Sequence, residues 1–342
     1  MSLLPLLFAL IATVLLLWYL GPIAKTMGLV ARPDQRRTHE FVVPLVGGVG
    51  MSIAFGLTLL LSSLPLGEYR ILFMGIGVLV GVGVLDDHKD ISPLARIIAQ
   101  TTVATLLVLA GQLSIHSLGE ILFIAQPYGL GVLAVPFSIL AIVGVINAFN
   151  MIDGHDGLAG ITAIISSCAI AFLCLLDNNL TSLKFFAIFV AVLLGFLIFN
   201  LPLLVGNTRQ VFMGDAGSMF VGLILVFGLI NLSQSGSYTI RTTAAPWIIG
   251  LPLVDMISVL IARLTKRRSP FDADRRHVHH LLLNIGLSKY QVLGVLIATQ
   301  IVFAMVGVLG TIHRWPDGIL FWGMFVILGP YMLMQKISSR QA

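Results

Sequence analysis

Charged residues and cysteines are scarce in this chain, and each shortage excludes a class of protein. Only 10% of the 342 residues are charged and 58% are hydrophobic, whereas soluble domains carry about 25% charged residues. The two cysteines, Cys168 and Cys174, lie in one apolar run and predict core packing rather than a disulfide or a metal site. Repeats, low-complexity tracts and long linkers are also lacking, so we expect a single domain over residues 1–342.

Long apolar runs recur along the whole chain and predict an all-α, polytopic integral membrane protein. A helix needs about 20 apolar residues to cross a bilayer, and runs such as 3–20 and 293–309 are almost continuously apolar. They do not alternate as the strands of a membrane β-barrel do. The first run lacks a basic n-region and a cleavage site, so we expect it to persist as a helix. About 11 transmembrane helices are predicted, at residues 3–23, 44–64, 70–85, 94–111, 131–149, 157–176, 184–203, 215–234, 242–262, 290–312 and 318–335.

Basic residues predict how these spans are oriented. An odd number of crossings puts the two termini on opposite sides, and all but four of the 20 Lys and Arg residues then fall on one side. The positive-inside rule makes that side cytoplasmic, with the N-terminus periplasmic and the C-terminus cytoplasmic. This asymmetry accounts for the net charge of +5 without a nucleic-acid partner. The cytoplasmic loops, which we expect to form the functional site, are 24–43, 86–93, 150–156, 204–214 and 263–289.

Five aspartates fall in short polar motifs on that predicted cytoplasmic side. Asp86 and Asp87 close the third span, where adjacent carboxylates near lipid are costly to ionise unless a cation or a hydrogen-bond donor compensates. Asp215 begins the eighth span, where it could cap the helix and leave free backbone N–H groups behind it as a cradle for a diphosphate. Each motif alone is compatible with an ordinary polar helix end, but their recurrence favours metal or phosphate chemistry.

The stretch Asn147–Gly157 follows the fifth span and is the densest polar motif. Asp153 and Asp156 are three residues apart, so on a helical turn they would face the same way, and Asn147 and Asn150 add side-chain donors. Two glycines in the stretch permit close backbone approach. A glycine turn with capping aspartates is the structural alternative. Oxygen ligands alone, together with a phosphate substrate, indicate Mg²⁺, with Mn²⁺ as the second choice.

A basic, histidine-rich loop lies between the ninth and tenth spans. Its arginines can each donate two hydrogen bonds to phosphate oxygens and its imidazoles add donors, so we interpret the loop as an anion clamp. A zinc half-site and a plain positive-inside loop are the alternatives. A second basic strip, 36–39, could hold a lipid head group or anchor the second span. The residues of the loop and the strip are Arg267, Arg268, Arg275, Arg276, His277, His279, His280, Arg37 and His39.

Taken in order along the chain, these motifs resemble one family over nearly the whole sequence. The matching stretches are Pro44–Gly48, Leu85–Asp87, Asn147–Gly157, Phe212–Ser218 and Arg275–His280. They resemble the polyprenyl-phosphate N-acetylhexosamine-1-phosphate transferases, and Asp274–His280 is similar to the branch that transfers N-acetylglucosamine-1-phosphate. Phe41 stands where relatives often have glycine, and His155 where they usually have an apolar residue.

The resemblance implies a reaction, a cofactor and roles for residues. N-acetylglucosamine-1-phosphate would pass from UDP-N-acetylglucosamine to undecaprenyl phosphate with Mg²⁺, in the lipid bilayer of the bacterial cytoplasmic (inner) membrane, and homodimers are common among relatives. Asp215, Asp86 and Asp87 would bind the metal. The expected catalytic residues are Asp86, Asp87, Asp156, His277, His279 and His280. The expected substrate-binding residues are Asn147, Asn150, Asp153, Phe212, Arg268, Arg275, Arg276, Arg37 and His39.

Other functions remain open from the sequence alone. The sugar could be another UDP-N-acetylhexosamine, such as the GalNAc, QuiNAc or FucNAc form. A secondary transporter is the alternative from a different class, because Asp255 lies inside a predicted span, although transporters often have inverted halves and none is detected. We expect a structural role for Asp255, reaching Arg263 or a polar backbone site. An intramembrane aspartyl protease would need a glycine where Phe212 stands.

Overall fold

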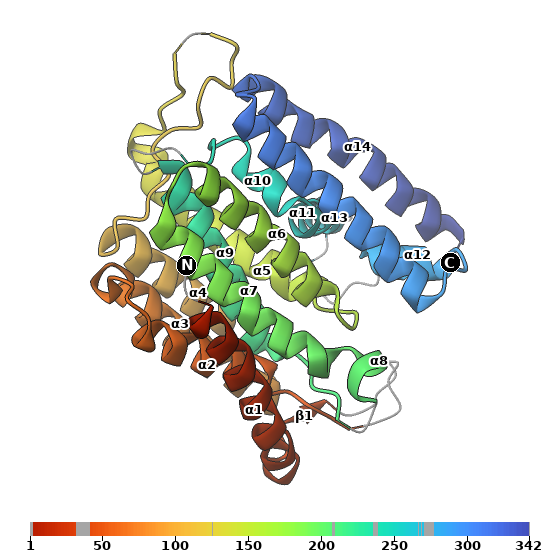
Figure 1. Cartoon of the computed structure of the whole chain (residues 1–342). Helices are drawn as coiled ribbons and strands as arrows, with labels where there is room; N and C mark the ends of the chain where they lie inside the picture. Colours follow the sequence, from red (N-terminus) through yellow and green to blue (C-terminus); the bar gives the residue numbers. More distant parts are fainter. Residues whose placement is uncertain are drawn as a thin grey trace.

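Helices dominate the computed structural model (Figure 1), which describes residues 3–31, 42–124, 126–206, 209–234, 239–265, 267, 269 and 277–341. One short antiparallel ribbon pairs β1 (Val30–Ala31) with β2 (Val43–Pro44). Apart from this ribbon the described elements are helices, so the prediction of an all-α chain is confirmed. The helices, with two 3-10 turns, are α1 (Leu4–Met27), α2 (Gly47–Leu61), η1 (Leu66–Tyr69), α3 (Arg70–Lys89), α4 (Pro93–Leu109), η2 (Gly131–Leu133), α5 (Ala134–Ile152), α6 (Leu158–Leu176), α7 (Leu180–Asn200), α8 (Pro202–Val205), α9 (Gly214–Gln234), α10 (Ala245–Ile248), α11 (Gly250–Thr265), α12 (Val278–Asn284), α13 (Lys289–Ile312) and α14 (Asp317–Gln341).

Seven helical stretches of the described chain are long and apolar enough to cross a membrane, so the chain is a multi-pass membrane protein. They are α1, η1 with α3, η2 with α5, α6, α7, α9 and α13. Three shorter apolar helices, α2, α4 and the first part of α14, cover three further predicted spans. The number of crossings and the side on which each terminus lies remain predictions.

Helix α9 is the centre of the fold. Within its most apolar stretch of 18 residues, 89% of the residues are buried. The helix packs against α2, α3, α5 and α6. A helix in the interior must be apolar on every side, and the sequence of α9 is apolar on every side. Phe220 of α9 meets Phe55 of α2 and Phe189 of α7, with the three ring centroids 5.6 to 5.8 Å apart. These edge-to-face contacts fix α9 between its neighbours.

Glycines let the neighbouring helices reach the first turn of α9. A β-carbon on Gly83 of α3 would lie 2.3 Å from Cα of Ala216, and one on Gly48 of α2 would lie 2.2 Å from the backbone nitrogen of Gly217. Membrane helices lack a hydrophobic drive to associate and depend on such close packing of small residues. Because Gly83 is one turn before Asp87, this contact brings the end of α3 to the start of α9.

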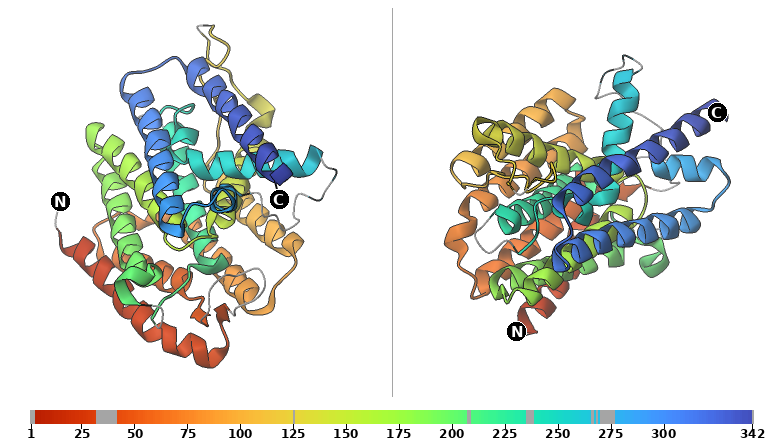
Figure 2. Two further views of the ribbon diagram at one scale, coloured as in Figure 1. Left: turned by 90° about the vertical axis from the view of Figure 1, so that its right-hand side faces the viewer. Right: turned by 90° about the horizontal axis from the view of Figure 1, so that it is seen from above.

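The predicted span 242–262 is wrong as a single helix. It is broken into α10 and α11, and α11 lies across α13 and α14: Figure 1 looks nearly along its axis, and it runs sideways in the left view of Figure 2. Pro252 has no N–H to donate to the carbonyl of Ile248. That carbonyl instead accepts from the side chains of Ser166 (2.9 Å) and Gln300 (2.8 Å). The buried amide of Gln300 therefore compensates for the break.

Candidate active site

The carboxyl-terminal ends of α3 and α5 meet the amino-terminal end of α9. The backbone N–H of Asp215 donates to Oδ1 of Asp87 over 3.0 Å. The side-chain amide of Asn150, on α5, donates to Oδ1 of Asp215 and to Oγ of Ser218, the latter at 2.9 Å. Three motifs that lie far apart in the sequence are thereby joined at one end of the bundle.

Arg96 is the cation of this cluster, and the sequence interpretation missed it as a site residue. Its guanidinium lies 2.7 Å from Oδ2 of Asp86 and 3.6 Å from Oδ2 of Asp215. Its position follows from a local signal, because Ser92 accepts a hydrogen bond from the N–H of Ala95 and so caps α4 one turn earlier. Arg96 thus sits in the first turn of α4, beside the end of α3. One guanidinium serves two carboxylates, which leaves the cluster with an excess of negative charge.

The free helix terminus expected at Asp215 is absent, so that expectation is wrong. α9 begins at Gly214, and the N–H groups of Asp215 and Ala216 both donate to the carboxylate of Asp87, at 3.0 and 3.4 Å. Gly214 has φ +71°, and a β-carbon on it would lie 2.5 Å from Oδ2 of Asp87. Glycine is therefore required here for its conformation and for space. Asp87 caps the helix from outside, and Asp215 lies in its first turn.

Asp153 and Asp156 lie in an irregular turn between α5 and α6, so the helical turn inferred from their spacing is wrong. Helix α5 ends at Ile152, and Gly157 has φ +80° where α6 begins. The N–H of Gly157 donates to the side chain of Asn200 over 2.7 Å, which fixes the turn to α7. Burial raises the pKa of Asp153 well above its ordinary value. The nearby carboxylates, first that of Asp215, raise it further. A cation placed among these carboxylates would relieve that repulsion.

His155 lies in the same turn. Its Nδ1 lies 3.1 Å from the carbonyl oxygen of Asp156, and its buried Nε2 has no hydrogen-bond partner among the residues that the structure describes. An unsatisfied ring nitrogen in this turn is an available contact for a polar ligand.

Asp255 holds the histidine-rich segment at the start of α12. Its carboxylate lies 2.8 Å from Nδ1 of His277, accepts the backbone N–H of Val278 at 3.0 Å, and accepts the hydroxyl of Tyr331 on α14. The expected contact of Asp255 with a polar backbone site is thus confirmed by the N–H of Val278, and the imidazole of His277 is a further partner. The sequence could not show this further contact, because the two residues lie on helices whose relative direction is set by the break before α11.

The histidines reach the aspartate motifs through Gly154. The rings of His277 and His279 stack with centroids 5.9 Å apart and planes 9° from parallel. A β-carbon on Gly154 would lie 2.9 Å from Cε1 and Nε2 of His279. The imidazole of His279 therefore lies directly against the residue that follows Asp153. The 277–279 segment therefore packs against the turn after α5.

Two other predicted site residues have structural contacts. The amide of Asn147 donates to the side chain of Gln100 (2.6 Å) and to the carbonyl of Val143 (2.8 Å), linking α5 to α4. Phe212 pairs through its backbone with Pro44 (2.9 Å) and Gly47 (3.0 Å). His280 lies in α12, and its side chain is outside the described residues. Arg37, His39, Arg268, Arg275 and Arg276 also lie outside the described residues.

The donor set fits a hard divalent cation such as Mg²⁺. In the part of the chain that the structure describes, no three His, Cys, Asp or Glu side chains form a ready-made metal group. Mg²⁺ does not require one, since it is usually held by one or two carboxylates and by phosphate oxygens of the substrate. Asp215, Asp86 and Asp87 are the carboxylates that meet here, and each carboxylate oxygen in a hydrogen bond keeps a second lone pair.

The fold and the site define a multi-pass membrane protein with carboxylates, amides and imidazoles gathered at one end of its helices. Residues 69–233 match the model of glycosyl transferase family 4. The chain is 34% identical over 322 residues to the undecaprenyl-phosphate alpha-N-acetylglucosaminyl 1-phosphate transferase of Escherichia coli strain K12, covering 93% of this chain and 87% of that protein. It is 33% identical to the protein of that name from Yersinia pestis (90% and 85%) and 32% to that from Haemophilus influenzae (91% and 87%).

The chain belongs to glycosyl transferase family 4. The resemblance inferred from the motifs is confirmed, since the match extends over most of the sequence and of each relative.

Proposed function

We propose that this chain transfers N-acetylglucosamine-1-phosphate from UDP-N-acetylglucosamine to undecaprenyl phosphate and releases UMP. The names of its relatives support the reaction. The observation in the molecule that carries it is the meeting of the Asp86-Asp87 pair, Asn150 and Asp215 at one end of α9. We further propose that this end faces the cytoplasm across the inner membrane and that the protein acts as a homodimer.

In the proposed reaction, a phosphate oxygen of the lipid attacks the β-phosphorus of the UDP-sugar, and the bond from that phosphorus to the bridging oxygen breaks. UMP departs with the bridging oxygen. Repulsion between the two anions is the main barrier to their approach. The second pKa of a phosphate monoester is about 6, so the small protonated fraction needs only a weak base, which Asp86 or Asp87 supplies.

The remaining residues position the substrates. We propose that Mg²⁺ (or Mn²⁺) is held by Asp215, Asp86 and Asp87 and neutralises charge on the diphosphate and the departing UMP. Nδ1 of His277 is engaged by the carboxylate of Asp255, so an imidazolium ring that carries both protons would donate from its other nitrogen to a phosphate oxygen. The proposed catalytic and substrate-binding set is completed by His279, His280, Arg268, Arg275, Arg276, Asp153, Asp156, Asn147 and Phe212. We propose Arg37 and His39 for the lipid phosphate.

The test is the release of UMP by purified enzyme in detergent, with undecaprenyl phosphate, Mg²⁺ and a panel of UDP-N-acetylhexosamines. Fastest turnover with UDP-N-acetylglucosamine, and none without the lipid phosphate, is expected. Faster turnover with UDP-N-acetylgalactosamine would reassign the sugar. Transport of a solute in proteoliposomes without any UMP release would replace the transferase by a transporter.

The attack is proposed to be direct, because binding both substrates together already supplies much of the rate advantage. Incubation with labelled UDP-N-acetylglucosamine and no lipid separates the two routes. UMP released in an amount equal to the enzyme, with label retained on the protein, would establish a phosphorylated aspartate instead.

A further inference from the structure

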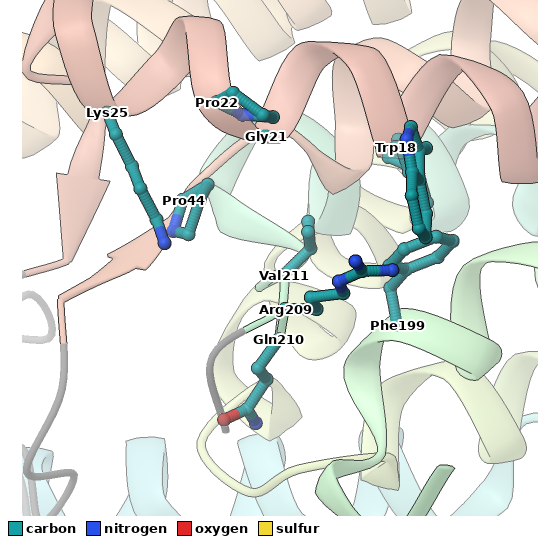
Figure 3. A pocket seen from close by; sticks show the side chains of 10 residues that line it. Trp18, Gly21, Pro22, Lys25, Pro44, Phe199, Arg209, Gln210 and Val211 are labelled. Carbon is teal, nitrogen blue, oxygen red and sulfur yellow. The ribbon is translucent and has the colours of Figure 1, made fainter. Parts of the chain in front are cut away.

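A cavity of about 330 Å³ lies apart from the carboxylate site. One wall is the carboxyl-terminal half of α1, with Trp18, Pro22 and Lys25, and the other is formed by Pro44, Phe199 and the segment 209–211 (Figure 3). Neither the aspartates nor the histidines of the active site line it. Its volume is at the lower end of the range for cavities that hold a small ligand or part of a larger one.

The cavity is cationic. Lys25 and Arg209 reach it from two different segments, and none of its ten lining residues is acidic (Figure 3). Cζ of Arg209 lies 3.9 Å from the ring centroid of Trp18. Stacking on the indole holds the guanidinium flat and leaves its N–H edge for an anion. The charge and the geometry both suit a phosphate group.

The cavity also lies where lipid meets the protein. α1 is one of the candidate membrane spans. Trp18 is 47% exposed, and many other large apolar side chains of that helix are exposed too. Trp18 and Lys25 are seven residues apart, so they lie on the same face about two turns from each other. Tryptophan favours the bilayer interface, and lysine extends its ammonium group toward the polar layer. Arg209 lies at the Trp18 end of the cavity and Lys25 at the Pro44 end (Figure 3), so an occupant would meet a cation from each side and apolar surface between them.

We propose that this cavity binds the phosphodiester head group of an anionic phospholipid, such as phosphatidylglycerol, with its acyl chains lying along α1. Basic pockets between membrane helices recognise such head groups. A soluble phosphate would use the two cations but not the apolar wall. The bound lipid stabilises the segment 209–211, which continues through the backbone pairing of Phe212 with Pro44 to Asp215.

The experiment measures phosphatidylglycerol and phosphatidylcholine retained by the full chain, by native mass spectrometry and by the lipid-induced rise in Tm. The double variant Lys25→Gln/Arg209→Gln is compared with Lys289→Gln, which removes one exposed charge at the start of α13, away from the cavity. The wild type and Lys289→Gln should prefer phosphatidylglycerol. The double variant should bind it at least about tenfold more weakly, since each basic residue contributes about 1 kcal/mol to anionic-lipid binding.

Competition separates the sources of the phosphate. Retained preference in the double variant, or displacement of the lipid by glycerol phosphate, would overturn the proposal. Displacement by stoichiometric undecaprenyl phosphate would make the cavity part of the acceptor site and also overturn it. The double variant should keep its Tm in lipid-free detergent. If the double variant does not fold, two single variants replace it. Lys25→Arg keeps the charge and should retain the preference for phosphatidylglycerol, whereas Arg209→Gln should lose it.

Discussion

The carboxylate of Asp87 caps the helix that carries Asp215. Its Oδ1 accepts the backbone N–H of Asp215 at 3.0 Å, and its Oδ2 accepts that of Ala216 at 3.4 Å. The neighbouring carboxylate of Asp86 instead pairs with Arg96 at 2.7 Å. The two adjacent aspartates therefore have different partners, and substitutions at each should have different effects on stability.

We expect Asp87→Ala to lower the free energy of unfolding by about 1–3 kcal/mol, because it leaves the buried N–H groups at the start of α9 without an acceptor. Asp87→Asn keeps one acceptor oxygen and should cost less stability, yet both variants should lose UMP release. Thermal unfolding in detergent and the UMP assay measure the two effects. Asp90→Asn, at an exposed position with φ +51° that asparagine tolerates, is the matched control and should leave both unchanged. Equal stability of Asp87→Ala and wild type would refute the cap.

Gly83→Ala should separate α3 from α9. The added methyl group would lie 2.3 Å from Cα of Ala216, which is backbone and cannot move aside, so both Tm and UMP release should fall. Gly81→Ala, two residues earlier on the same helix, meets nothing within 4 Å and should keep activity, with Tm unchanged or higher. If the two variants behave alike, close packing at Gly83 does not set the position of the carboxylates.

Chelation should stop turnover without unfolding the protein. EDTA is expected to abolish UMP release, and Mg²⁺ or Mn²⁺ to restore it. The protein should stay folded because contacts with Asn150, Arg96 and backbone groups also hold these carboxylates. Asp215→Asn should lower kcat by at least about 10²-fold and raise the Mg²⁺ concentration needed. Full activity of this variant, or activity in EDTA, would remove Asp215 from the metal site.

The sequence predicted which residues meet, but not how each one is used. The apolar runs located a helix within every predicted span, because length and hydropathy suffice for that. The motifs around Asp87, Asn150 and Asp215 were expected to lie together, and hydrogen bonds join them. The actual partner of the N–H groups of α9 is a side chain 128 positions away in the sequence, and no local pattern reports such a contact.

The break before α11 was missed for a related reason. Pro252 lies in the middle of the apolar run 242–262, and hydropathy does not register the missing N–H of a proline, so hydropathy alone favours one continuous span. Its cost becomes visible only with Gln300 and Ser166, which bond to the released carbonyl of Ile248. The same break directs α11, and therefore Asp255, toward the histidine segment. The role of Asp255 thus depended on tertiary structure that the pattern could not supply.

Asp255 is a positioning residue, and its effect should pass through His277. Asp255→Asn keeps an oxygen that can accept the N–H of Val278 but places an uncharged amide beside Nδ1 of His277. A misplaced imidazole costs up to about 10²-fold in rate, so kcat should fall while KM for undecaprenyl phosphate changes little. Tyr331→Phe, which removes another hydrogen bond to Asp255 without altering the histidine, is the control and should have a smaller effect.

A double-mutant cycle distinguishes this role from simple stabilisation of the fold. In a His277→Ala background, Asp255→Asn should cause no further loss of kcat, because the group through which it acts is gone. If Asp255→Asn only destabilised the fold, it would lower Tm by a similar amount, and the active fraction by the same factor, with and without His277→Ala. Additive losses of kcat in the two variants, with Tm falling in parallel, would show that Asp255 serves only to hold α11, α12 and α14 together.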